Sequence, residues 1–108
     1  MMGYTDFCRL MMAAQECESL EHYMAEVGGS VEEQDVAMLG DIYSLGHEGL
    51  SIRRIAEAAY ISLRRMAMTY GLPTRTVENW ASGDRTPPEW QLPMIAYAVI
   101  SDKAARHG

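Results

Sequence analysis

The chain has 108 residues, 48% of them hydrophobic and 22% charged, which suits one globular domain with its own core and argues against disorder. No apolar run approaches the roughly 18–20 residues that span a bilayer, and the start MMGYTDFCRL lacks the basic and apolar stretches of a signal peptide, so we expect a cytoplasmic protein without a membrane partner. The net charge of −6 looks wrong for a nucleic-acid binder until its distribution along the chain is considered.

The first half of the chain is predicted to form two helices. After a helix start at Thr5-Asp6, apolar residues recur at steps of three and four, which predicts one helix that continues to the glycine pair 28–29. The sequence SVEE that begins at Ser30 is a capping box and predicts a second helix, which runs to about Leu45. The glycine-flanked segment 46–49 is expected to be a break.

Three helix-sized segments follow in the second half, each marked by a capping or helix-ending residue. They cover about residues 51–60, 63–70 and 74–82. Ser62 is expected to cap the middle segment and Gly71 to end it, while Gly83 is expected to end the third.

The last helix has two possible starts. The sequence TPPE at 86–89 is another capping box, with Pro87 suited to a first helical position. Pro93 is unsuited to a helix interior because it removes a hydrogen bond and clashes with the preceding turn, so the helix either begins near Gln91 or is kinked there. No segment alternates like a strand, and we predict an all-α, compact domain of five or six helices.

Residues 62–82 have the pattern of a helix-turn-helix. Ala67 is small enough for two short helices to cross closely, and Gly71, four residues later, permits the left-handed backbone of a tight turn. Val77 and Trp80 lie three apart on the second helix and are expected to face the core. The outer face of that helix, which a recognition helix would present to the major groove, then consists of Thr74, Arg75, Glu78, Asn79 and Ser82.

The segment SLRRMAMTYGLPTRTVENWASGDRTPP, residues 62–88, resembles the phage-repressor-like helix-turn-helix family, also called the xenobiotic-response-element regulators. The resemblance rests on M-A-x-x-x-G-L-P followed by R-T-V-x-N-W-x-x-G-x-R-x-P-P and covers roughly residues 50–100. It implies sequence-specific binding to double-stranded DNA as a homodimer, with the helix 74–82 in the major groove. Two residues depart from the pattern: Leu63 stands where many members have a glutamine, and Glu78 places a negative charge on the face that would meet DNA.

The predicted base contacts lie on one helix face, and each has an alternative role. Arg75 matches the O6 and N7 of a guanine, or forms a surface ion pair with Glu78 three residues later. Asn79 matches an adenine or is a solvated polar residue, and Glu78 accepts from cytosine N4 or restrains Arg75. Thr74 completes the set, at a helix N-terminus that attracts anions. The predicted phosphate contacts are Ser62, Arg64, Arg65, Thr76, Ser82 and Arg85.

Charge divides the chain into two regions. Residues 1–50 contain one basic and ten acidic residues, a net charge of −9, whereas residues 51–108 contain eight basic and five acidic residues, a net charge of +3. Any DNA contact must therefore come from the second half. We expect residues 1–49 to form an acidic helical layer that serves as a dimer or partner surface, and residues 50–108 to form the DNA-binding region, within one folded unit.

Other candidate sites are weak. The histidines are scattered at positions 22, 47 and 107 without metal-ligand spacing, and no glycine-rich phosphate loop is present, so we predict a non-enzyme without metal or cofactor. Cys8 and Cys17 are nine apart and are expected to be reduced, partly buried thiols. Trp90, like Trp80, is expected to pack against the core rather than stack on bases. Arg53 and Arg54 are further candidate phosphate contacts, of which one points at DNA because neighbours on a helix diverge by about 100°.

Two functions remain open at this point. The first is a sequence-specific, dimeric transcriptional regulator of the kind that phages and mobile elements carry. The second is an acidic protein-binding module, such as an antitoxin or a phage-encoded inhibitor, that keeps a helix-turn-helix scaffold and grips a basic partner. The arginines near residues 62–85 favour the first, and the charge of −9 on residues 1–50 favours the second.

Overall fold

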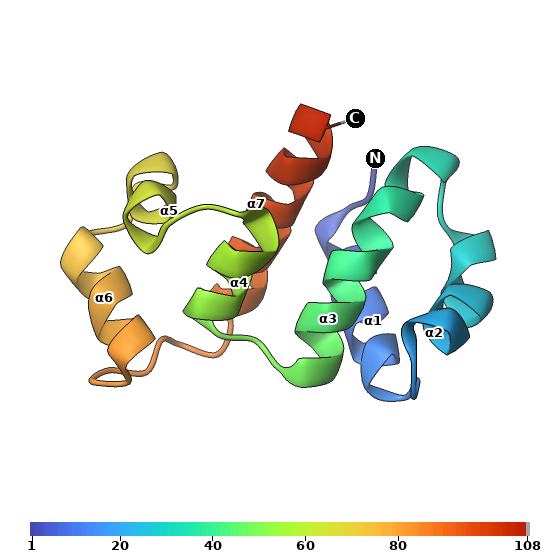
Figure 1. Cartoon of the computed structure of the whole chain (residues 1–108), viewed down its shortest axis with the longest axis horizontal. Helices are drawn as coiled ribbons and strands as arrows, with labels where there is room; N and C mark the ends of the chain where they lie inside the picture. Colours follow the sequence, from blue (N-terminus) through green and yellow to red (C-terminus); the bar gives the residue numbers. More distant parts are fainter. Residues whose placement is uncertain (108) are drawn as a thin grey trace.

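A computed structural model describes residues 1–107 and shows an all-helical protein, with no strand in that range (Figure 1). The α-helices are α1 (Tyr4–Gln15), α2 (Leu20–Val27), α3 (Leu39–Glu48), α4 (Ile52–Ala59), α5 (Leu63–Thr69), α6 (Thr74–Ser82) and α7 (Gln91–His107). Two 3-10 helices, η1 (Gly28–Ser30) and η2 (Glu33–Met38), join α2 to α3. The predicted all-α class is confirmed, and the predicted number of helices is wrong because the described chain has seven α-helices. None of its described helices is both long and apolar enough to cross a membrane.

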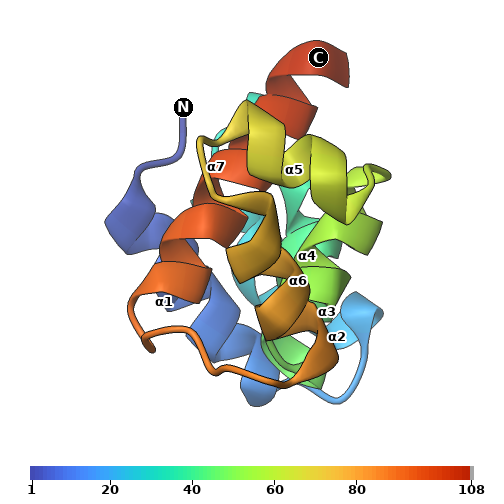
Figure 2. The same cartoon turned by 90° about the vertical axis from the view of Figure 1, so that its left-hand side faces the viewer.

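The molecule is elongated, measuring 41 × 27 × 21 Å along its principal axes. Helices α1, α2 and α3 form one end and α5 and α6 form the other, while α4 and α7 lie between them (Figures 1 and 2). We call these the N-terminal end and the α5–α6 end. The two ends therefore correspond to the acidic and the basic regions of the sequence.

The predicted single helix over residues 5–27 is two helices, α1 and α2. The backbone N–H of Glu16 bonds to Ala13 as α1 ends, and the Ser19 hydroxyl then caps α2 by accepting from the N–H of His22. The new direction buries Tyr23 completely, and its hydroxyl donates to the carbonyl of Leu10 on α1 at 2.9 Å. The apolar spacing continues across the change of direction between α1 and α2 because both helices bury an apolar face in the same core. The spacing alone therefore could not reveal the break.

The prediction for residues 30–49 is confirmed only for residues 39–45, which are helical as part of α3. The Ser30 hydroxyl donates to the carbonyl of Val27 instead of capping a following helix, and α3 begins only at Leu39. The expected break at 46–49 is helical up to Glu48, and Gly46 lies at the contact between α3 and α1. A Cβ at Gly46 would collide with the carbonyl oxygen of Met11, so this glycine permits close helix packing and does not mark a turn.

The predictions for the second half are confirmed to within a residue or two. The hydroxyls of Ser51 and Ser62 cap α4 and α5 by accepting backbone N–H bonds, and α6 ends at Gly83, whose φ is +87°. The TPPE sequence does not open a helix, because α7 begins at Gln91. Pro93 then lies in the first turn of α7, where a backbone N–H has no partner within the helix.

Helix α7 connects the two ends through the core. Ile95, Ala96, Val99 and Ile100 are buried in it, and α7 packs against α4, α1 and η2. Near its C-terminus, the Lys103 ammonium donates to Asp41 of α3 at 2.8 Å and to the carbonyl at the end of α4 at 2.7 Å. The core is therefore one cluster that runs from α1 to α6.

Candidate nucleic-acid interface

Helices α5 and α6 are joined by a tight turn over residues 70–73. Met66 and Ala67 of α5 are fully buried, and the carbonyl of Ala67 accepts the N–H of Leu72 from the far side of the turn at 2.9 Å. Gly71 has a φ of +69°, which an L side chain rarely adopts. The small residue and the glycine thus have the roles expected for them, and they hold α5 and α6 in direct contact.

Helix α6 lies at the tip of the long axis and buries little of its own surface. Figure 2 looks along that axis, with α6 in front and α5 above it. Val77 is fully buried and Trp80 partly buried against the core, as predicted. The predicted base-contacting residues share the other side of the helix, with Arg75 and Glu78 exposed and Thr74 and Asn79 partly exposed.

The N-terminus of α6 has no side-chain cap. Pro73 occupies the capping position, where its carbonyl accepts the N–H of Val77 but its side chain has no atom that could accept another backbone N–H. The first-turn N–H groups of this nine-residue helix therefore lack the acceptor that Ser51 and Ser62 provide for α4 and α5. An uncapped N-terminus carries the positive end of the helix dipole and favours an anion nearby.

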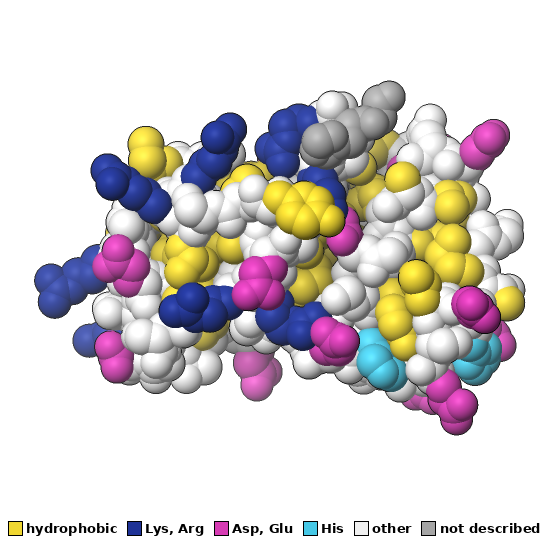
Figure 3. All heavy atoms as spheres, viewed as in Figure 1, with side chains coloured by type: hydrophobic (Ala, Val, Ile, Leu, Met, Phe, Trp, Pro, Cys, Tyr) yellow, Lys and Arg dark blue, Asp and Glu magenta, His cyan; other side chains and the backbone are white. Residues whose placement is uncertain are grey.

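Four arginines around α5 and α6 have exposed side chains and, within residues 1–107, no carboxylate within 4.0 Å. They are Arg64, Arg65, Arg75 and Arg85. Arg9 and Lys103, in contrast, pair with Asp6 and Asp41 at 2.8 Å. On the face shown in Figure 3, basic side chains lie over the α5–α6 end and the middle of the molecule with acidic side chains among them, whereas the N-terminal end shows acidic and histidine side chains and no basic one.

These contacts bear on two alternatives that the sequence leaves open. Arg75 does not form the ion pair with Glu78, so its guanidinium is not held on the protein surface. Of the pair Arg53 and Arg54, Arg54 points inward, where it donates to Ser44 and to Glu48 at 2.6 Å. Arg53 is therefore the stronger candidate of the two for a phosphate contact. Arg53 stays exposed while its Nε donates to a carbonyl near the end of α6, at Ala81.

The predicted hydroxyl contacts have structural roles already. The Ser62 hydroxyl accepts the N–H of Arg65 at 3.0 Å, and the Ser82 hydroxyl donates to the carbonyl of Asn79 at 3.2 Å. Thr76 is partly buried. A phosphate contact by these residues has to coexist with the local structure that they stabilise, so the arginines are the stronger candidates.

No family model, no curated protein and no solved structure matches this chain.

Three further predictions concern residues outside α5 and α6. Trp90 is 64% exposed, so the expectation that it packs against the core is wrong. His22 lies 3.4 Å from Glu26, and a ring nitrogen of His47 lies 3.1 Å from the carbonyl of Ala14; the side chain of His107 lies outside the described residues. Within the described part of the chain, no three metal-ligating side chains come together. The two thiols are unbridged, as expected, with one of them buried.

A hydrogen bond between the end of α5 and α7 was not predicted from the sequence. The Tyr70 hydroxyl, at the end of α5, donates to a carboxylate oxygen of Asp102 at 2.7 Å. Burial, together with this hydrogen bond, raises the pKa of Tyr70 to about 12, so the phenol stays protonated and continues to donate. The two residues are 32 apart in the chain, and no local pattern could have paired them.

Proposed function

We propose that this protein is a sequence-specific DNA-binding transcriptional regulator, in which α5 and α6 form the helix-turn-helix and α6 enters the major groove. One observation carries the proposal: four exposed arginines, which have no acidic partner among residues 1–107, surround a helix whose outward face is polar and whose N-terminus has no side-chain cap. Positive charge at this end attracts the phosphates, while side chains on α6 read the bases.

Within this proposal, Arg75 is the principal base contact. Its guanidinium is exposed and has no ion pair with any residue in the described range, so binding a guanine breaks none there. Glu78 and Asn79 lie on the same face and would read neighbouring bases, and Thr74 begins the helix beside the N–H groups that would hold a phosphate. Arg64, Arg65 and Arg85 would anchor the backbone on either side.

Selection of bound fragments from random duplex DNA, followed by affinity measurement on the selected site, tests the proposal. Arg75→Ala is expected to weaken binding to that site by about 1–3 kcal/mol and to relax the preference at one base pair. The matched control is Arg9→Ala, which removes the same charge from an exposed arginine at the N-terminal end. The proposal fails if no sequence is enriched, or if the two variants bind the selected site equally well.

Salt dependence tests the phosphate contacts separately. If four to six phosphates are neutralised, the logarithm of the binding constant should fall against the logarithm of salt concentration with a slope near −4 to −5. Removing Arg64, Arg65 or Arg85 one at a time should reduce the slope by about 1 each while leaving the base preference unchanged. A homodimer, which is part of the proposal, should protect two half-sites about one helical turn apart.

The second candidate function is an acidic protein-binding module. It is favoured by the net charge of −9 on residues 1–50, whose carboxylates are mostly exposed at the N-terminal end. An acidic helical surface of this kind would complement a basic protein. If this is the function, the protein should show no salt-dependent binding to DNA but should bind a basic protein. Binding of the basic protein should then be unchanged by Arg75→Ala.

A further inference from the structure

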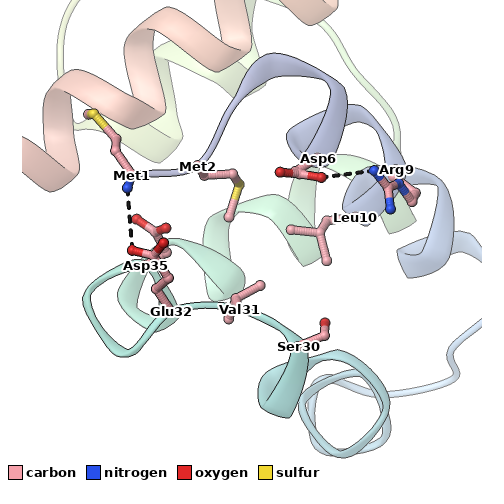
Figure 4. A pocket seen from close by; sticks show the side chains of 9 residues that line it. All are labelled: Met1, Met2, Asp6, Arg9, Leu10, Ser30, Val31, Glu32 and Asp35. Carbon is pink, nitrogen blue, oxygen red and sulfur yellow. Dashed lines mark hydrogen bonds and ion pairs between the residues drawn. The ribbon is translucent and has the colours of Figure 1, made fainter.

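A cavity of about 250 Å³ lies at the N-terminal end, between the first residues of the chain, α1 and the segment that contains η2. Its apolar wall consists of Met2, Leu10 and Val31. Three carboxylates also line it, those of Asp6, Glu32 and Asp35. Figure 4 shows Glu32 and Asp35 together on one side of the hollow, with Leu10 on the opposite side and Met2 above.

Two of these three carboxylates have partners within the protein, and the third has none among the described residues. Asp6 accepts from Arg9 at 2.8 Å, and Glu32 accepts from Gln34 at 2.8 Å and lies 3.4 Å from the terminal ammonium of Met1. Asp35 is only 7% exposed, yet its carboxylate accepts no hydrogen bond and forms no ion pair with any residue from 1 to 107.

Neither carboxylate oxygen of Asp35 is completely shielded from solvent, so the small exposed part of this residue leaves its charge open to the cavity. A carboxylate that is mostly removed from water and has no cationic partner favours a cation in contact with it. The cavity gives an external donor access to Asp35, because Asp35 is part of its lining. Asp6 and Glu32 already have positively charged partners within the protein, so only the charge of Asp35 is left without one among the described residues. One positive charge from a ligand would therefore complete the site. Calcium and magnesium prefer six or more oxygen ligands, so the apolar wall and a single free carboxylate suit an organic cation better.

We propose that this cavity binds an ammonium or guanidinium group carried on a short aliphatic stem, with the cation on Asp35 and the stem against Leu10, Val31 and Met2. The group belongs either to a free amine or to a lysine or arginine side chain of a partner protein. The site lies at the opposite end of the molecule from α5 and α6, so it does not depend on DNA binding.

Titration of the ¹⁵N-labelled full chain with butylammonium chloride, followed by NMR, tests the proposal. Saturable shifts are expected at Leu10, Val31 and Asp35, while equal concentrations of sodium chloride and of 1-butanol should leave these signals unsaturated. Asp35→Asn, which keeps the shape and removes the charge, should weaken binding about tenfold, as expected for a hydrogen bond to a charged group. The peptide acetyl-Gly-Lys-Gly-amide serves as the second probe, and tighter binding of either probe identifies the source of the cation.

The matched control is Glu33→Gln, which makes the same change in net charge on an exposed residue of η2 that does not line the cavity. It should leave the affinity within about twofold of the original chain. The proposal would be overturned if Asp35→Asn and Glu33→Gln weakened binding equally, or if the shifts occurred only at other residues. It would also be overturned if neither probe saturated the signals at a 100-fold molar excess over about millimolar protein. The shift map of the unsubstituted chain decides the question even if Asp35→Asn does not fold.

Discussion

The two ends of the molecule achieve order by different means. At the N-terminal end, α1 and α3 pack closely enough that Gly46 leaves no room for a side chain, and Phe7, Ile42 and Tyr23 are fully buried there. At the α5–α6 end, Val77 is the one α6 residue that is buried. The N-terminal end is therefore held mainly by extensive packing, whereas the α5–α6 end combines the packing of Met66, Ala67 and Val77 with a turn, a cap and a few hydrogen bonds.

This difference separates stability from recognition. Helix α6 can present polar and basic side chains at the tip because it contributes little to the core, and α1, α3 and α7 supply the apolar contacts that α6 lacks. Substitutions at the N-terminal end should therefore change the stability of the whole chain. Substitutions at the α5–α6 end should act more locally and on binding.

The largest effect is expected from a side chain at Gly46. Gly46→Val places atoms against the carbonyl of Met11 and the Cβ of Ala14, and α1 and α3 have to separate to make room. We expect a loss of about 3 kcal/mol in the free energy of unfolding or failure to fold, measured by urea denaturation.

Gly40→Ala is the matched control, because Gly40 is exposed on the same helix and a Cβ there meets nothing within 4 Å. This substitution should raise stability by about 0.5–1 kcal/mol, since alanine favours the helix. If Gly46→Val behaves like Gly40→Ala, close packing of α1 on α3 is not what holds the N-terminal end.

The comparison of the two ends also explains which elements could be predicted from the sequence. The bounds of α5 and α6 follow from signals that lie beside them, namely Ser62, Gly71 and Gly83, and these positions were predicted correctly. The break between α1 and α2 was missed because apolar spacing continues across it. Gly46 was misjudged because its function depends on α1, more than thirty residues earlier in the chain.

The candidate site shows the same division. The outward face of α6 could be predicted because one helix places Arg75, Glu78 and Asn79 together. Whether a charged side chain is paired could not be predicted, since the partners of Arg54 lie on α3 and Arg75 has none among the described residues. The cavity at Asp35 was not predicted at all, because its walls come from separate segments.

Alkaline pH should weaken both ends through one tyrosine on each, the fully buried Tyr23 and the partly buried Tyr70. Burial raises the pKa of Tyr23 and of Tyr70 from 10 to about 12, so the folded chain binds these protons more tightly than the unfolded chain. The resulting stability is fully present below pH 10 and is lost as pH rises from 10 to 12. For Tyr23, which is fully buried, the loss is on the order of 2 kcal/mol.

Urea denaturation at pH 9, 10 and 11 measures this loss, and Tyr23→Phe and Tyr70→Phe assign it. Each substitution should flatten part of the pH dependence, and Tyr23→Phe should flatten more because Tyr70 is partly exposed. A dependence that neither substitution changes would show that these phenols are not protected as described.

The smallest loss of stability is expected from removing the N-terminal caps of α2 and α5. The hydroxyls of Ser19 and Ser62 each accept a backbone N–H three residues later, at 3.1 and 3.0 Å, so either change to alanine should cost about 1 kcal/mol. Hydrogen exchange should distinguish them: Ser62→Ala should speed exchange mainly in α5 and α6, whereas Ser19→Ala should speed it in α2 and, through the Tyr23 bond to Leu10, in α1. Because α5 positions α6, Ser62→Ala should also weaken DNA binding at a temperature where the chain remains folded. Uniform loss of protection along the whole chain in both variants would mean that the two ends unfold together, and the separation of stability from recognition would not hold.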